Sequence, residues 1–204
     1  MQKFTRLSAP ACPLDVVNLN TDQLLPARYL KWSRSAGLGK VLFHDLRFDE
    51  QENEQPNFPL NHPVWRKAQI MVGRANFGCG SSREAAVYAL LDYGIRCVIA
   101  PSFGDIFSGN AVQNGLLTAI VSDADAATLI ATLHAMPAEI VSVDLEGQTI
   151  ACAGKSYLFS IDPVRRTRLL NGWDDVALTM SFQDQVAAFK AADRTRRPWA
   201  TPSI

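Results

Sequence analysis

Residues 69–121 alternate between apolar runs and a helical pattern, and this alternation restricts the fold more than any other feature of the 204-residue chain. The runs at 69–73, 95–100 and 116–121 are short and nearly continuously apolar, which is typical of strands in a parallel sheet. Helices are predicted between them, at 82–93 and 103–114, because each segment is followed by a glycine and the first repeats apolar side chains at helical spacing. The order strand–helix–strand–helix–strand predicts an α/β fold with a mostly parallel central sheet flanked by helices.

The segments on either side of this core are more mixed. After it, the pattern predicts helices at 124–135, 163–171 and 181–192 and short strands at 140–145, 148–153 and 157–161. Before it, we expect an extended start and a short helix capped by Thr21 or Asp22. Residues 30–63 are expected to form a flexible flap, with the proline-rich part at 49–63 outside the core. We therefore expect one domain over 1–193 and a solvated tail at 194–204.

Charge and composition exclude several classes of protein. Lys and Arg number 20, as do Asp and Glu, so the chain lacks the basic excess expected of a nucleic-acid-binding protein. No apolar run is long enough to span a membrane, and the amino-terminal residues do not resemble a secretory signal. These features predict a cytoplasmic protein. The cysteines and histidines are too widely spaced to indicate a metal site or a redox pair: Cys12, Cys79, Cys97, Cys152, His44, His62 and His134.

A glycine- and serine-rich motif occupies the first strand–helix junction, at residues 76–84 (Asn-Phe-Gly-Cys-Gly-Ser-Ser-Arg-Glu). Gly78 and Gly80 allow a tight turn and a close approach to a ligand. Ser81 and Glu84 have the spacing of a capping box, and Arg83 adds a cation beside the amino end of the predicted helix. Such an arrangement is suited to binding a carboxylate or a phosphate.

The second junction, at residues 101–105, repeats this pattern with Ser102 as the predicted helix cap. Adjacent parallel strands carry such junctions at the same edge of the sheet, where ligands commonly bind. The alternative is that both junctions are ordinary capped helices. A phosphate-binding P-loop is not indicated, because the lysine that it requires is missing. A serine hydrolase is only weakly indicated, because no glycine follows two residues after Ser81.

The motif, together with its flanking sequence, resembles the small subunits of 3-isopropylmalate dehydratase, which correspond to the swivelling domain of the aconitase superfamily. The resemblance extends over nearly the whole chain apart from the tail. It is carried, in the order of the family, by Pro13–Asp15, Thr21–Pro26, Leu42–Phe48, Asn76–Glu84, Asp92–Gly94, Val98–Phe103, Asp105–Phe107, Asn114–Leu117 and Asn171–Asp174. The implied fold is the aconitase-type swivelling β/β/α domain.

The resemblance also implies an activity and a set of site residues. Members of the family are hydro-lyases of leucine biosynthesis, which interconvert 2-isopropylmalate and 3-isopropylmalate by removing and returning water. By this resemblance Ser81 is the base that takes the proton alpha to a carboxylate, and Arg83 binds a carboxylate of the small hydroxy-dicarboxylate substrate. The residues expected to bind or surround the substrate are Ser82, Thr21, Asp22, Arg47 and Lys31.

The chemistry of dehydration indicates a partner chain. Hydroxide is a poor leaving group and usually requires a Lewis acid, for which this sequence offers no clustered thiolates. In the family, a large subunit carries a [4Fe-4S] cluster on its own cysteines. The sequence therefore predicts that this chain binds no cofactor and is active only with a large subunit.

Departures from the family pattern leave the substrate open. Ala85 stands where many relatives have histidine, and Leu46 replaces a common tryptophan. One alternative is a paralogous hydro-lyase for another hydroxy-diacid, of the citraconate or methylmalate type. A second is a non-catalytic anion-binding domain, and a third is a self-contained hydrolase that uses Ser81.

Overall fold

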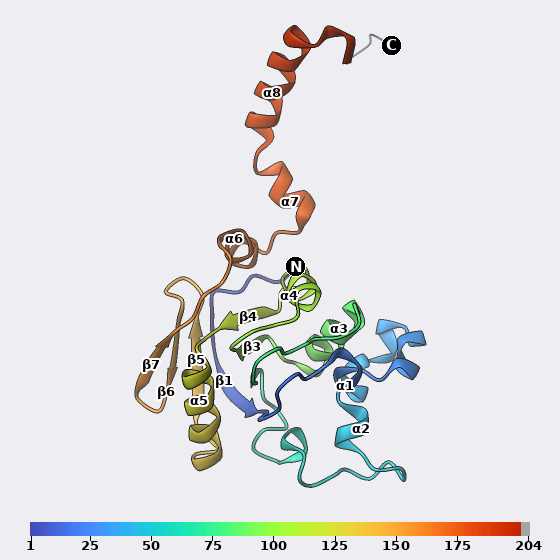
Figure 1. Ribbon diagram of the computed structural model, residues 1–204, viewed down its shortest axis with the longest axis vertical. Helices are drawn as coiled ribbons and strands as arrows, with labels where there is room; N and C mark the ends of the chain where they lie inside the picture. Colours follow the sequence, from blue (N-terminus) through green and yellow to red (C-terminus); the bar gives the residue numbers. More distant parts are fainter. Residues whose placement is uncertain (201–204) are drawn as a thin grey trace. The chain divides into compact units, whose positions relative to one another are not determined.

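The computed structural model describes residues 1–200 and divides the chain into two compact units, at 1–172 and from Trp173 onward. The first unit is built on a seven-stranded sheet with the strand order β4-β3-β2-β1-β5-β6-β7 (Figure 1). This α/β architecture confirms the predicted fold class. The strands are β1 (Arg6–Pro13), β2 (Ile70–Val72), β3 (Cys97–Ala100), β4 (Leu117–Ile120), β5 (Ile140–Asp144), β6 (Thr149–Cys152) and β7 (Lys155–Leu158).

Four strands, β1 to β4, form the parallel half of the sheet. Their register aligns Ala11 with Ile70, Ile70 with Cys97, and Cys97 with Leu117. The connections between β2, β3 and β4 are the helices α3 (Glu84–Tyr93) and α4 (Asp105–Gln113), as the sequence pattern predicts. The remaining strands extend the sheet in antiparallel fashion from the other side of β1.

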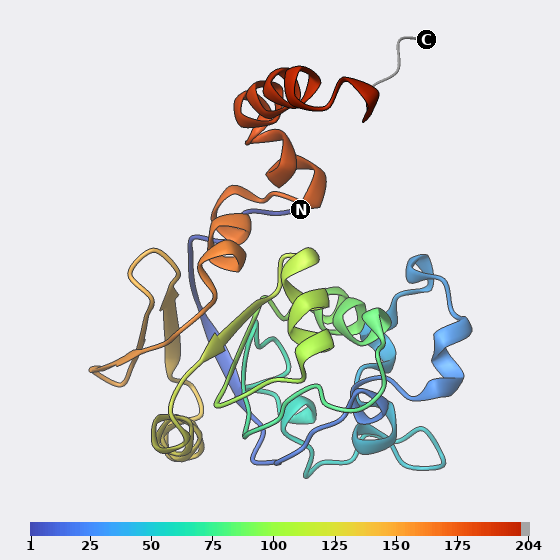
Figure 2. The same ribbon diagram turned by 45° about the horizontal axis from the view of Figure 1, so that its top comes forward.

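Side chains alternate between the two faces of the sheet, and each face has its own apolar core. Cys12, Met71 and Val98 lie in the core that also contains residues of α1 (Thr21–Leu24) and α3. Ile70 and Ile99 point into the other core, which α5 (Asp123–Ala135) and α6 (Pro163–Asn171) complete. Figure 2 shows the strands between α5 and α3. The sheet is thus covered on both faces, as parallel strands require.

Residues 27–61 fold into short helical turns: η1 (Ala27–Lys31), η2 (Arg34–Ala36), η3 (Leu38–Val41), α2 (His44–Arg47) and η4 (Pro59–Asn61). Leu42, Phe43 and Leu60 are fully buried in the core that contains α3. The expectation that 49–63 lies outside the core is therefore wrong at Leu60, because this apolar side chain turns inward from an otherwise polar segment. The flexibility of the 30–63 flap stays a prediction.

The second unit contains α7 (Asp175–Met180), α8 (Gln183–Arg196) and η5 (Pro198–Ala200), and none of its described residues is buried. The sequence pattern predicts α8 but misses α7, which begins after the capping side chain of Asp174. The chain divides at 172, and the expected domain boundary at 193 stays a prediction. The last tail residues, 201–204, lie outside the described part of the chain. Within residues 1–200, no helix has the length and apolar character needed to cross a membrane.

Candidate active site

The glycine- and serine-rich motif follows β2 and is held on one side by the segment that follows β1. The backbone N–H of Gly78 donates to the carbonyl of Leu19 at 2.7 Å, and that of Thr21 donates to the carbonyl of Cys79 at 2.9 Å. A parallel bridge pairs Asn20 with Cys79. The pairing of β1 with β2 is thereby continued into the motif, which brings α1 beside Ser81.

The other side of the motif is held by the segment that follows β3. The backbone N–H of Phe77 donates to the carbonyl of Ser102 at 3.0 Å, and that of Gly104 donates back to Phe77 at 2.9 Å. The two predicted strand–helix junctions are therefore in direct contact at the carboxyl ends of adjacent parallel strands. This confirms the expected juxtaposition, which needs only the strand order and the parallel direction.

Gly78 and Gly80 give the motif its turn, as predicted. Their φ angles are +73° and +91°, in the left-handed region that glycine adopts without steric cost. A Cβ atom on Gly78 would lie 2.3 Å from Cγ of Phe107, so a larger residue would collide with α4. The first glycine therefore sets how closely the motif packs on α4.

A cavity of about 260 Å³ opens at this junction and brings three of the expected site residues together. Ser81 and Arg83 come from the motif, and Thr21 comes from the start of α1. Thr21 is buried, and its Oγ1 donates to the backbone carbonyl of Ser81 at 2.8 Å. The full lining is Thr21, Gly78, Cys79, Gly80, Ser81, Arg83, Gly104, Asp105, Ile106 and Phe107.

Asp22 forms an ion pair with Arg83, which lines this cavity. The side chain of Arg83 is 17% exposed, whereas that of Asp22 is 53% exposed. The ion pair therefore joins a mostly buried guanidinium to a carboxylate that remains largely open to solvent. Asp22 does not line the cavity itself but contacts the lining residue Arg83, and its role toward substrate stays a prediction.

Three expected helix caps are wrong. Ser81 and Glu84 form no capping box, because α3 begins only at Glu84, with Arg83 at its N-cap. Asn20, rather than Thr21 or Asp22, caps α1 and forms a capping box with Gln23. The N-cap of α4 is Gly104 and not the expected Ser102, whose Oγ accepts a hydrogen bond from the backbone N–H of Asn76. Residues at or next to two of these caps pair with another loop, as Asn20 does with Cys79 and Phe103 does with Phe77, and local spacing does not reveal such contacts.

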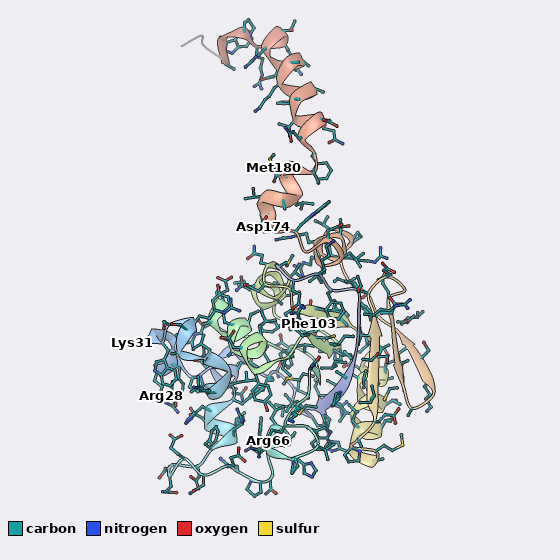
Figure 3. The ribbon with its side chains drawn as sticks, turned by 180° about the vertical axis from the view of Figure 1, so that it is seen from behind. Arg28, Lys31, Arg66, Phe103, Asp174 and Met180 are labelled. Carbon is teal, nitrogen blue, oxygen red and sulfur yellow. The ribbon has the colours of Figure 1, made fainter. Side chains whose placement is uncertain are left out.

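The remaining expected site residues do not line this cavity. Ser82 is exposed beside it. Lys31 is exposed on η1, at the outer edge of the segment that also carries Arg28 (Figure 3). Arg47 is buried, donates to Asn61 and to the carbonyl of Leu42, and has its pKa lowered by burial. Contacts of these residues with substrate stay predictions.

Several residues of the cavity were not singled out from the sequence as site residues. Gly104 and Asp105 belong to the second junction, so their position at the same edge of the sheet was the available signal. Ile106 is 55% exposed and Phe107 is buried, and both enter the cavity from the first turn of α4. Both belong to Asp105–Phe107, a segment that carries the family resemblance, but nothing in the sequence assigns them to the site rather than to the core.

The thiols of this chain do not fit a metal cluster. Cys12 lies in the core on one face of the sheet, whereas Cys97 and Cys152 lie in the core on the other face. Cys79 lines the cavity, and its Sγ contacts the carbonyl of Asn18 at 3.3 Å. In the part of the chain that is described, no three His, Cys, Asp or Glu side chains converge as metal ligands. The sheet itself keeps the thiols apart.

Comparison with known proteins defines the class of this fold and site. A family model described as the aconitase C-terminal domain matches residues 1–124. A crystal structure of 3-isopropylmalate dehydratase from Methanocaldococcus jannaschii has a TM-score of 0.65, with 24% identity, and covers 91% of this chain and 99% of that one. The fold, with its cavity at the strand ends, is thus of the aconitase C-terminal domain class.

Curated relatives identify the family within this class to which the chain belongs. The 3-isopropylmalate dehydratase small subunit of Rhodospirillum centenum is 48% identical over 201 residues, covering 98% of this chain and 99% of that protein. The small subunit of Phenylobacterium zucineum is 46% identical over 200 residues, with 98% of each chain covered. This chain belongs to the family of 3-isopropylmalate dehydratase small subunits. The resemblance identified from the sequence motifs is confirmed.

Proposed function

We propose that this chain is the small subunit of a heteromeric hydro-lyase that interconverts 2-isopropylmalate and 3-isopropylmalate in the cytoplasm. The observation that carries the proposal is the cavity in which Ser81, Arg83 and Thr21 meet. The names of the curated relatives, which align over nearly their full length, support the same reaction.

Arg83 is the proposed carboxylate ligand. Its side chain is mostly buried, so its charge acts in a medium less polarisable than water, and its planar donors match a carboxylate. Substrate binding would replace the Asp22 carboxylate at Arg83 with a carboxylate of the substrate. Before the substrate binds, the ion pair with Asp22 holds Arg83 in place, and the Asp22 carboxylate balances the charge of the guanidinium.

Ser81 is the proposed base. As the alkoxide, its Oγ would take the proton alpha to a substrate carboxylate; the C–H electrons form the carbon–carbon double bond, and hydroxide leaves from the neighbouring carbon. A serine alkoxide needs nearby positive charge, which Arg83 two residues away supplies. Thr21 fixes the backbone at Ser81 through its 2.8 Å hydrogen bond. When water adds back with its hydroxyl and hydrogen on exchanged carbons, the product is the isomer.

The partner is proposed to be a large subunit that carries a [4Fe-4S] cluster, as the family resemblance implies. Such a cluster supplies a Lewis acid for the departing hydroxide. The thiols of this chain, described above, do not fit as ligands of such a cluster. We therefore assign none of the residues of this chain to cluster binding. The contribution of this chain is proton transfer and carboxylate binding.

Reconstitution tests the proposal. The chain is co-purified with the large subunit of its own organism, and formation of the unsaturated diacid from 2-isopropylmalate is followed by absorbance. We expect activity only in the mixture, reduced about 10³-fold in kcat by Ser81→Ala and roughly 10–100-fold in kcat/KM by Arg83→Lys. Ser156→Ala, at an exposed serine of β7, is the matched control and should retain full activity.

A panel of substrates separates this function from the alternatives. Faster turnover of citraconate or of a methylmalate than of 2-isopropylmalate would assign the chain to a paralogous hydro-lyase. Ala85, which packs half-buried against the core behind the motif, is the departure that makes this comparison necessary. Anion binding without turnover in any mixture would indicate a non-catalytic domain.

A further inference from the structure

Polar side chains join the three loops that leave the carboxyl ends of β1, β2 and β3. Asn18 follows β1, Asn76 follows β2, and Ser102 follows β3. Nδ2 of Asn76 donates to Oδ1 of Asn18 at 2.8 Å, and the backbone N–H of Asn76 donates to Oγ of Ser102 at 2.8 Å. We call these three residues the loop brace. One hydrogen bond links the loop after β1 to the loop after β2, and the other links the loop after β2 to the loop after β3, so each bond joins neighbouring strands of the sheet.

Both asparagines hold the left-handed backbone conformation. The φ angle of Asn18 is +58° and that of Asn76 is +62°. Asparagine tolerates this region better than other residues with a side chain, whereas most would be strained there. A backbone hydrogen bond of 3.0 Å from Asn18 to the carbonyl of Ala75 ties the two turns together. Two matched turns, rather than one, therefore set the direction in which the motif leaves β2.

The brace lies at the start of the motif that carries Ser81. Ser102 also accepts the backbone N–H of Phe77 at 3.0 Å, directly after Asn76. The carbonyl of Asn18 faces Sγ of Cys79 at 3.3 Å. The motif is thus fixed on both sides before it reaches Ser81, although all three brace side chains are on exposed residues. Exposed hydrogen bonds contribute little to stability, so their effect is on geometry.

We propose that the loop brace positions Ser81 for proton transfer, with Asn18, Asn76 and Ser102 as positioning residues that do not touch the substrate. The inference rests on the proposed function, because it assigns these residues to the same reaction. Displacing a reacting group by about 1 Å costs on the order of 100-fold in rate. Loss of the brace should therefore lower kcat more than it changes KM or the melting temperature.

Glycine and aspartate variants separate the hydrogen bond from the backbone conformation. Asn76→Gly keeps the left-handed turn available but removes the donor, and we expect kcat of the reconstituted complex on 2-isopropylmalate to fall about 10–100-fold. KM and the melting temperature should change little. Asn18→Asp keeps the acceptor oxygen and should retain most activity, whereas Asn18→Gly should lose it. Ala153→Gly, at a left-handed position between β6 and β7, is the control for the glycine substitution itself.

The outcomes are distinct. Two results would refute the positioning role of the loop brace: an unchanged kcat in Asn76→Gly, or equal losses of kcat in Asn18→Asp and Asn18→Gly. Neither result would affect the assignment of Ser81 as the base. Should Asn76→Gly fail to fold, the comparison at position 18 decides alone. Full activity of Ser81→Ala would instead refute the proposed function, and the brace would fall with it.

Discussion

Gly78 shows how one residue controls the site. A Cβ atom at Gly78 would collide with the ring of Phe107, and one at Gly104 would lie 2.6 Å from the carbonyl oxygen of Gly78, so the contact between the motif and α4 leaves no room for a side chain at either position. This contact places the first turn of α4, with Ile106, along the wall of the cavity. The absence of a side chain at position 78 is therefore part of the geometry of the site.

Gly78→Ala is expected to lower the free energy of unfolding by about 3 kcal/mol, from the left-handed backbone and the collision with Phe107. Urea denaturation of the whole chain measures this. Gly109→Ala is the matched control within α4, because a Cβ there meets no atom within 4 Å. That variant should be stabilised by about 0.5–1 kcal/mol. Equal effects of the two substitutions would contradict the packing described for Gly78.

Asp144 gives the stability a pH dependence. Hydrogen bonds from the backbone N–H of Gly147 and from Arg6 lower the pKa of this carboxyl below its ordinary 3.8. The folded state therefore favours the charged form. The resulting stability is complete above the ordinary value and is lost as the pH falls through the lowered pKa.

Asp144→Asn should accordingly flatten the fall in melting temperature as the pH drops below the ordinary value of 3.8, because the variant has no carboxyl to protonate. Calorimetry at a series of pH values checks this. Asp184→Asn, at an exposed aspartate of α8, is the control. An unchanged pH profile in Asp144→Asn would show that other carboxyls determine the acid stability.

At the scale of elements, the central part of the chain follows from its sequence. β2, α3, β3, α4 and β4 all lie within the predicted segments, because buried parallel strands and the helices between them have strong and different periodicities. α7 and the helix starts at Glu84 and Asp105 do not follow, since caps and short helices depend on contacts between loops. For the site, Ser81, Arg83, Thr21 and Asp22 are brought together, whereas Ile106 and Phe107 are recognised only as part of a family segment and not as site residues.

The helices after Gly172 should add little to the stability of the first unit. Both apolar cores lie within residues 1–172, and no described residue from 173 onward is buried. A chain that ends at Gly172 should melt within about 3 °C of the full chain, which corresponds to less than ~1 kcal/mol. Circular dichroism on both chains measures it. Failure of the shorter chain to fold would show that the second unit belongs to the folding domain, as the expected boundary at 193 implies.

At the scale of the whole molecule, the proposed function makes this chain one half of a catalytic site. One cavity at the carboxyl ends of β2 and β3 holds a hydroxyl and a guanidinium, and Thr21 ties the segment after β1 to it. These groups suit removal of a proton beside a carboxylate. Departure of hydroxide requires a group that the proposed large subunit would bring. The proposed function therefore assigns proton transfer to this chain and activation of the leaving hydroxide to its partner.

Exchange of substrate hydrogen with solvent tests the role of Ser81 most directly. The reconstituted complex is incubated with 3-isopropylmalate in D2O, and deuterium at the carbon that loses its proton is measured by mass spectrometry. The account predicts that Ser81→Ala slows incorporation about 10³-fold, while the complex still assembles and binds the diacid. Incorporation at the parental rate in Ser81→Ala would contradict the claim that this hydroxyl moves the proton.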